Sequence, residues 1–292
     1  MFEHLCTLAS TSAICLFLGG QVFAADQDET IEQSKPAVSG INAKLDIQYN
    51  YLDFSSLTGH YDSPSVIGSI ALPVGHRFGL QIDAGVTHFE ATSLPPSATV
   101  AGGAAHLFWR DPDFALVGIY GHYANLSFSG GGPNLDLWRL GAEVELYLDR
   151  ISIEGFAGAD LLNAPVGNLD FFSGDLNFAY YANDNFRIHG GIVHQFDHTL
   201  GRFGSEVMLP FGDNNISLYA DGAFGSGIDS VRGGLRIYFG ESGKSLVARH
   251  REDDPKARFE FFGLDVNTNS EQGCPAGMVD EGNGNCVEIE AG

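Results

Sequence analysis

Apolar and polar residues alternate one by one through most of this chain, and this period of two constrains the fold more than any other feature. Between Trp138 and Leu148 the even positions are Trp, Leu, Ala, Val, Leu and Leu, whereas the odd positions are Arg, Gly, Glu, Glu and Tyr. Successive side chains of a β-strand point to opposite faces. The segment therefore predicts a strand with one apolar and one polar face.

The parity of the alternation reverses after Asp149-Arg150, and a two-residue hairpin turn explains the reversal. Beyond the turn the apolar row begins with Ile151, and the polar row holds Glu154 and Asp160. A turn of two residues makes Leu148 and Ile151 cross-strand partners, which keeps both apolar rows on one side of the sheet. The carboxylates of the two strands therefore share the opposite side.

The same pattern recurs from Gly40 to Phe239 and predicts twelve strands. Their expected ranges are 43–54, 66–72, 78–89, 100–109, 114–126, 135–148, 151–162, 172–181, 186–196, 202–209, 216–224 and 231–239. The connections carry Gly, Pro, Asn and Asp, which turns select for backbone freedom or side-chain hydrogen bonds. Most connections after even-numbered strands are tight, whereas several after odd-numbered strands are longer.

Four segments follow from composition. Residues 1–24 predict a signal peptide, with an apolar middle and small residues before a cleavage site at Ala25. A first transmembrane helix is the alternative, but the apolar run is short and broken by Thr and Ser. Residues 25–39 form an acidic segment, residues 40–239 hold the strands, and residues 240–292 are expected to form a periplasmic tail. No later segment approaches the roughly 18 consecutive apolar residues of a spanning helix, so a membrane form would be a barrel.

The tail holds two of the four cysteines, Cys274 and Cys286, because Cys6 and Cys15 leave with the signal peptide. Two thiols in an exported chain usually form one disulfide, so we expect these two to close a loop, which would stabilise it by about 3 kcal/mol. A mixed-charge linker precedes this loop. The apolar linker residues expected to dock against the barrel rim are Phe259, Phe261 and Leu264.

Periodicity alone does not decide which face meets water, because a soluble sandwich or lipocalin-like barrel uses the same alternation with its apolar row inward. Three features favour a membrane barrel. The apolar row contains many Gly and Ala residues and would fill a twelve-strand interior poorly. Aromatic residues lie toward strand ends, as in the girdles at membrane interfaces. These are Tyr51, Phe54, Phe89, Phe108, Trp109, Tyr123, Trp138, Phe171, Phe172, Tyr180, Tyr181, Phe186, Phe211 and Tyr238.

The third feature is that the polar rows keep ionisable residues in strand centres, which suits a solvated lumen. The candidate lumen-lining residues are Lys44, Asp46, Asp83, Arg139, Glu143, Glu145, Glu154, Asp160, Asp175, Arg187, Glu206, Arg232 and Arg236.

The run VRGGLRIYF, from Val231 to Phe239, resembles the closing strand of Gram-negative outer-membrane β-barrel proteins, and residues 40–239 resemble porin-like barrels as an architecture. The resemblance implies an all-β fold, a closed antiparallel transmembrane β-barrel of about 12 strands in an up-and-down meander. It also implies location in the bacterial outer membrane, contact with its lipid, and recognition by the barrel-assembly machinery. Phe239 is not the last residue, because 53 residues follow it in this chain of 292.

Charge supports one hypothesis about function. Residues 40–239 hold 9 Lys and Arg against 21 Asp and Glu, a net charge of −12, and the whole chain carries −22, which argues against nucleic acid as a partner. An open acidic lumen would concentrate cations, so we expect a porin-like channel for passive passage of small cationic or neutral solutes. The alternative is that the carboxylates pair across strands with the lumen arginines and block it.

Two other functions stay open: a closed outer-membrane barrel with a structural or lipid-modifying role, and a soluble exported barrel that binds an apolar ligand. A lipid hydrolase needs a serine activated by histidine, and the sequence has no Gly-x-Ser-x-Gly or His-x-Ser pair. His194, Asp197 and His198 are close in sequence, but a lone pair of histidines is a poor metal site. We therefore expect no enzyme, no metal and no cofactor.

Overall fold

The computed structural model describes residues 34–55, 59–92, 97–131, 134–164, 167–211, 213–253, 255–258, 278–280 and 286–288. The predicted signal peptide, most of the acidic segment and Cys274 lie outside these residues. No helix within the described ranges is long and apolar enough to cross a membrane.

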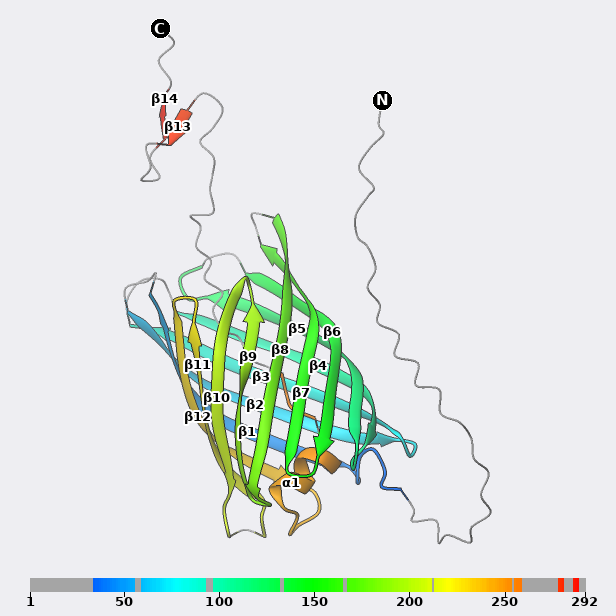
Figure 1. The fold of residues 1–292 in the computed structure, drawn as a ribbon. Coiled ribbons are helices and arrows are strands. Elements are labelled where there is room, and N and C mark those ends of the chain that lie inside the picture. The colour runs from blue at the N-terminus through cyan, green and yellow to red at the C-terminus, as the bar shows by residue number, and fades with distance from the viewer. Residues whose placement is uncertain are drawn as a thin grey trace, which may run out of the picture. The chain divides into compact units, whose positions relative to one another are not determined.

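Twelve antiparallel strands form a closed barrel in meander order, as the sequence predicted (Figure 1). The strands are β1 (Asn42–Phe54), β2 (His60–Val74), β3 (Phe78–Ala91), β4 (Ala98–Asp111), β5 (Ala115–Phe128), β6 (Leu135–Leu148), β7 (Ile151–Ala164), β8 (Gly167–Asn183), β9 (Phe186–Gln195), β10 (His198–Met208), β11 (Ile216–Gly225) and β12 (Ile228–Phe239). Strand β12 pairs with β1, with Ala43 opposite Phe239 and Tyr51 opposite Val231. This seam leaves the barrel without a free edge, so its backbone polar groups are paired within the wall.

The hairpin between β6 and β7 confirms the turn read from the sequence. Leu148 lies opposite Ile151, and Arg139 lies opposite Asp160. Asp149 has a φ of 49°, a left-handed conformation that two-residue hairpin turns require and that Asp tolerates. The parity reversal in the sequence therefore marks this turn correctly.

Several strands extend beyond their predicted ranges, and β2 is the clearest case. The sequence predicted residues 66–72, whereas the strand covers His60–Val74. Pro64 lies opposite Tyr49 of β1, but the β2–β3 register skips Ser63 and Pro64. Proline has no N–H to donate to a ladder, so it interrupts pairing with one neighbour without ending the strand.

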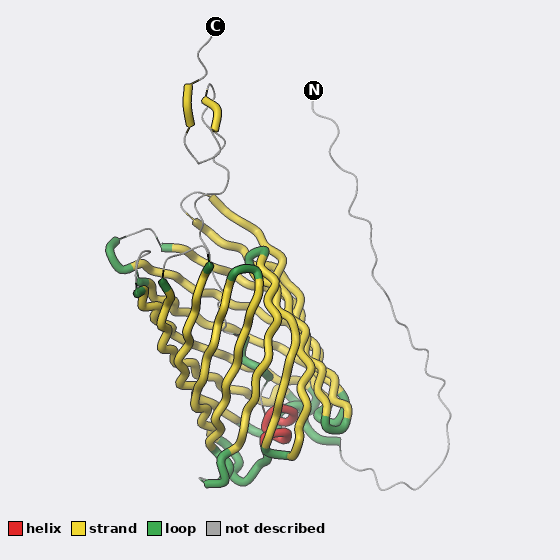
Figure 2. The backbone as a smooth tube through the Cα atoms, turned by 60° about the vertical axis from the view of Figure 1, so that its left-hand side comes forward, coloured by secondary structure: helices red, strands yellow, loops and turns green. Residues whose placement is uncertain are grey.

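The two ends of the barrel differ in their connections. We call one end of the barrel the turn end. It holds the connections after even-numbered strands, the start of β1 and the finish of β12. The opposite end, called the loop end, holds the connections after odd-numbered strands; Figure 2 shows the loops and turns at both ends in green. After β12 the chain forms a short helix, α1 (Leu246–Ala248), and a π-helical turn, η1 (Arg249–Asp253). A separate hairpin consists of β13 (Met278–Asp280) and β14 (Cys286–Glu288).

Burial along the strands is the reverse of that in a soluble barrel. Glu143 is 2% exposed and Glu145 is 6% exposed, whereas Val144 between them is 42% exposed. Exposed large aliphatic or aromatic side chains occur on every one of the twelve strands. Charged residues are almost never buried without partners, and a broad apolar outer face suits lipid rather than water.

The aromatic residues do not all belong to the outer girdles that the sequence predicted. Trp138, Phe172 and Tyr180 are exposed on the outer face, as expected. Four others are buried inside the barrel, namely Phe54, Phe108, Tyr181 and Tyr238. Their inward parity matches the charged rows, so position near a strand end was not sufficient to assign them.

Candidate functional site: the barrel lumen

All thirteen ionisable residues proposed to line a lumen lie on the inward rows of their strands. Ten of them are buried, and the other three, Asp175, Arg232 and Arg236, are largely covered. They come from β1, β3, β6, β7, β8, β9, β10 and β12, so they surround the interior. The structure therefore brings these residues together around one space.

Pairs of opposite charge connect neighbouring strands across this interior. Arg139 donates two hydrogen bonds to Asp160, at 2.6 and 2.8 Å, from directly opposite positions on β6 and β7. Arg187 forms an ion pair with Glu154. Bidentate and charge-assisted hydrogen bonds of this kind satisfy charges that have been removed from water.

Arg236 joins three strands of the wall. Its guanidinium donates to Asp46 at 2.6 Å and to Glu206 at 2.9 Å, which joins β12 to β1 and β10. Glu206 also accepts hydrogen bonds from Ser217, at 2.6 Å, and from Tyr238, at 2.9 Å. On this side the arginines do pair with carboxylates, as the alternative of a blocked lumen supposed.

His106 bridges two carboxylates on the other side of the lumen. Its Nε2 lies 2.9 Å from Asp83, and its Nδ1 lies 3.0 Å from Glu143. His106 occupies the inward parity of β4, but it was not among the residues predicted to line the lumen. Glu145 is a further buried carboxylate on β6, and it accepts a hydrogen bond from Tyr147 at 2.8 Å.

The chain after β12 anchors itself at the turn end. Arg249 is 1% exposed, donates to the carbonyl of Asn214 at 2.9 Å, and stacks 4.7 Å from the ring of Tyr238. Leu246 is buried against Met208 and Tyr238. These contacts fix η1 beside the turns (Figure 1).

Residues 255–258 then lie inside the lumen, contacting the wall progressively further from the turn end. Arg251 donates to the carbonyl of Ile151, the first residue of β7, at 3.1 Å. The carbonyl of Pro255 accepts from Lys44 at 2.9 Å, and Arg258 donates to the carbonyl of Gly155 at 3.1 Å. Residues 255–258 of the predicted tail therefore contact the inner face of the barrel wall. The residues from 259 to 277 lie outside the described part of the chain.

Arg258 supplies positive charge to lumen carboxylates. Its guanidinium pairs with Asp175 and lies 3.4 Å from Glu143. It also stacks over the ring of Phe156 at 5.2 Å. Carboxylates from two strands, β6 and β8, are thus held around one tail residue.

A pair of glycines makes room for the ring beneath Arg258. Gly141 and Gly158 lie opposite each other on β6 and β7. A Cβ added at Gly141 would come within 2.5 Å of both the Phe156 ring and the Ala157 carbonyl oxygen. The absent side chains therefore form the slot in which Phe156 lies and supports the guanidinium.

A cavity remains between the tail and the wall. Its volume is about 80 Å³, and polar residues from the wall and from the tail line it, including Asp46, Glu154, Glu206 and Lys256. Polar space of this size holds on the order of five water molecules. The described lumen therefore has room for a few water molecules but is not a wide aqueous pore.

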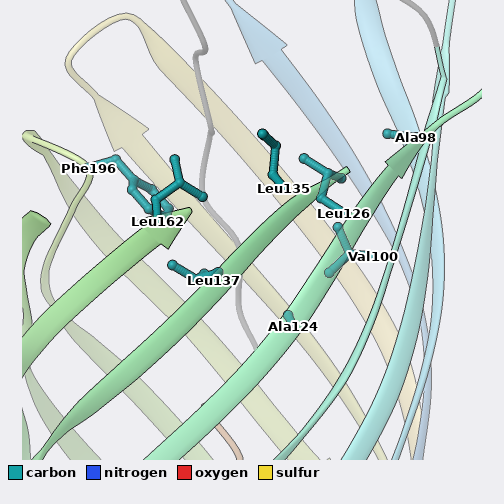
Figure 3. Close-up of a cluster of buried hydrophobic side chains, with 8 residues drawn as sticks. All are labelled: Ala98, Val100, Ala124, Leu126, Leu135, Leu137, Leu162 and Phe196. Carbon is teal, nitrogen blue, oxygen red and sulfur yellow. The ribbon is translucent and has the colours of Figure 1, made fainter. Parts of the chain in front are cut away.

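The inward rows change from charged to apolar at the loop end. We call this zone the apolar collar. Figure 3 shows one side of it, where inward side chains from β4, β5, β6 and β7 converge. Its buried members are Leu52, Phe54, Ala98, Val100, Ala124, Leu126, Leu135, Leu137, Leu162, Val193, Phe196, Leu200, Ala223 and Ile228.

Sequence reasoning missed the collar and Arg258 for different reasons. The collar was visible in principle, because Leu135 and Leu137 share the parity of Arg139 and Glu143. Arg258 had no local signal, since Glu143 lies 115 positions away in the chain.

The histidines considered as metal ligands do not gather. His194 contacts the hydroxyl of Thr199 at 2.7 Å and lies beside the ring of Phe172. Within the described ranges, no three His, Cys, Asp or Glu side chains are grouped in a way that would hold a metal ion.

No protein-family model and no curated protein matches this chain. Among solved structures, the translocator domain of the autotransporter NalP from Neisseria meningitidis is 14% identical, with 69% of this chain covering 88% of that one at a TM-score of 0.50. The KdgM porin in complex with disordered oligogalacturonate is 13% identical, with coverages of 67% and 99% and a TM-score of 0.46. Outer membrane phospholipase A from Escherichia coli is 12% identical, with coverages of 73% and 94% and a TM-score of 0.44.

At these identities the likeness concerns the fold alone. The closed twelve-strand meander, the apolar outer face and the charged interior nevertheless agree with one class of protein. The chain has the architecture of a bacterial outer-membrane β-barrel protein, and its broad apolar outer face suits membrane lipid.

Proposed function

We propose that this barrel is an outer-membrane channel for small cationic or neutral solutes, and that its C-terminal segment restricts passage while it occupies the lumen. The proposal starts from the charge of the lumen wall. Carboxylates surround the interior, and fixed negative charge in a confined space raises the local concentration of cations.

The proposal rests mainly on one observation: a positive charge that compensates lumen carboxylates comes from outside the barrel wall. Arg258, which neutralises Glu143 and Asp175, belongs to the tail and not to the wall. Withdrawal of the tail would remove this guanidinium and leave both carboxylates facing water. The same movement would widen the lumen, so passage and cation preference would increase together.

Ion pairs within the wall oppose free passage but leave room for it. Arg139 pairs with Asp160, directly opposite it on the neighbouring strand. Arg187 of β9 pairs with Glu154 of β7. Such pairs keep side chains near the wall, whereas residues 255–258 occupy space between the walls. The tail is therefore the element whose displacement would change the pore most.

Single-channel recording on the purified full-length protein tests this proposal. We expect Arg258→Gln to increase conductance and to shift the reversal potential in a KCl gradient toward that of K⁺, because Asp175 loses its ion-pair partner and Glu143 keeps only His106. The preference should weaken between 0.1 M and 1 M salt, as the screening length falls from about 10 Å to about 3 Å. Arg77→Gln is the matched control, since Arg77 pairs with Asp111 at the turn end, away from the lumen centre.

Adding Glu143→Gln and Asp175→Asn to the Arg258→Gln variant should return the reversal potential toward zero. If this triple variant conducts and keeps its cation preference, groups other than Glu143 and Asp175 set the selectivity. If neither the wild-type protein nor Arg258→Gln conducts, the barrel is closed by its own wall, and a structural or enzymatic role would be favoured.

A further inference from the structure

The apolar collar places apolar side chains on the inner wall, where the lumen of an open channel would meet water. Inward side chains of an open outer-membrane barrel normally meet water, yet Leu52, Leu137 and Leu200 are buried at the loop end of this lumen. An apolar surface of this extent needs an apolar partner to remain out of water.

We propose that the C-terminal chain passes through the barrel from the turn end to the loop end, with residues 259–264 seated in the apolar collar and the Cys274–Cys286 loop delivered to the loop side of the membrane. This inference does not depend on whether the barrel conducts. It concerns only the path of the chain.

The described residues set the direction of that path. Between Arg251 and Arg258 the contacts on β7 move from Ile151 to Gly155, away from the turn end. Four residues of a strand correspond to about 13 Å. The chain therefore points toward the loop end when it leaves Arg258.

The length of the following segment matches the distance to the collar. Leu162 lies seven residues beyond Gly155 on β7, and Leu137 lies six residues from Glu143 on β6, both toward the loop end. With strand tilt, this separation is about 15–18 Å along the barrel axis. Six extended residues span up to about 20 Å.

The chemistry of that segment also matches. Residues 259–264 read FEFFGL, an aromatic run that directly follows the charged sequence KAR. The lumen wall changes in the same order, from carboxylates around Arg258 to the aliphatic collar. Burial of the three phenylalanine side chains against the collar would remove both apolar surfaces from water.

The 28 residues after Leu264 would then lie on the loop side. They include the hairpin of β13 and β14, in which Asp280 lies opposite Cys286. The barrel would in this way carry a small structured module of its own chain to the outer surface.

Labelling of cysteines on intact cells tests the location of the C-terminus. In a Cys274→Ser variant we expect Cys286 to react with a polyethylene-glycol maleimide too large to cross the outer membrane. Two control positions in a Cys274→Ser, Cys286→Ser background bracket the result: Ser129→Cys at the loop end and Asp184→Cys at the turn end. The background itself reports any reaction of Cys6 or Cys15.

Labelling of Cys286 to the same extent as Ser129→Cys supports the proposal. Reaction only after permeabilisation of the outer membrane, as expected for Asp184→Cys, would overturn it. Reaction only after denaturation would also overturn it, because the C-terminus would then lie inside the lumen.

Disulfide trapping in the full chain tests the position of the aromatic run. In the background without Cys274 and Cys286, we expect Phe261→Cys or Phe262→Cys to crosslink with Leu137→Cys or Leu200→Cys of the collar. Leu140→Cys is the matched control, because Leu140 lies on the outward face of the same strand and is 52% exposed. Failure of every collar pair to crosslink, in protein that folds and assembles, would exclude this seat for residues 259–264.

Discussion

Val144 and Glu145 are consecutive residues with opposite surroundings. The valine is exposed on the outer face, whereas the glutamate is buried in the lumen beside Tyr147. In a soluble protein this distribution would be unfavourable for both residues. In a membrane barrel it lowers the free energy of each, because lipid receives the valine and polar partners receive the carboxylate.

We therefore expect Val144→Arg to destabilise the folded barrel by about 2–4 kcal/mol, the range for a cation near the bilayer midplane. Glu145→Gln should have little effect, because an amide oxygen can still accept the hydrogen bond from Tyr147. Urea unfolding of the barrel in liposomes measures both variants. Equal stability of Val144→Arg and the wild-type protein would show that this row does not face lipid.

Gly141 has no side chain, and the ring of Phe156 occupies the space that a side chain would fill. Phe156 lies across Gly141 and Gly158, and the ring supports the guanidinium of Arg258. We expect Gly141→Ala to destabilise the barrel by about 1–3 kcal/mol, since the new methyl group would press on a backbone oxygen as well as on the ring. Gly68→Ala is the control, because a Cβ there has no atom within 4 Å. Thermal unfolding in detergent compares the two, and similar losses would contradict the packing role.

At the scale of elements, the inward row of β1 is graded rather than uniform. It begins with Asn42, Lys44 and Asp46 at the turn end and finishes with Leu52 and Phe54 at the loop end. Along this strand, polar and charged contacts therefore come first and apolar contacts last. A chain with the same order of chemistry, such as the tail, can match the wall along its length.

The π-helical turn η1 is the element that connects this tail to the wall, and His250 is its titratable contact. Its imidazole meets the hydroxyls of Tyr181 and Tyr238 and the carboxylate of Glu206, with Arg187 and Arg236 nearby. Burial lowers the pKa of His250 from its ordinary value near 6.5, the two arginines contribute in the same direction, and Glu206 opposes them. Released from the wall, the imidazole would regain its ordinary pKa.

Protons therefore bind the released tail more readily than the docked tail. Docking should be strongest above pH 6.5 and should weaken as the pH falls through 6.5 toward the lowered pKa of His250. A spin label at Ala257→Cys, in a background without Cys274 and Cys286, should become more mobile between pH 7.5 and pH 5.5. His250→Gln should remove this change, and an unchanged pH response in that variant would place the titration elsewhere.

For the whole molecule, the sequence predicted the strands of the barrel wall far better than the contacts of the tail inside the lumen. Period-two parity was enough to place Glu143 and Glu154 inside and Ile151 outside, because every strand residue must point to one face or the other. It failed where one residue broke the pattern, as with Pro64. It could not find the pairing of Arg258 with Asp175, since that contact depends on the path of a segment with no period of its own.

The seam between β1 and β12 does not need the tail in order to form. It ends at Phe239, whereas Arg258 lies 19 residues further along the chain. In a barrel that closed without its tail, Asp175 would lack the guanidinium of Arg258 and Glu143 would keep only His106. Such a barrel would be more negative and more hydrated than the docked form, and docking of residues 255–258 would expel water and counterions from its interior.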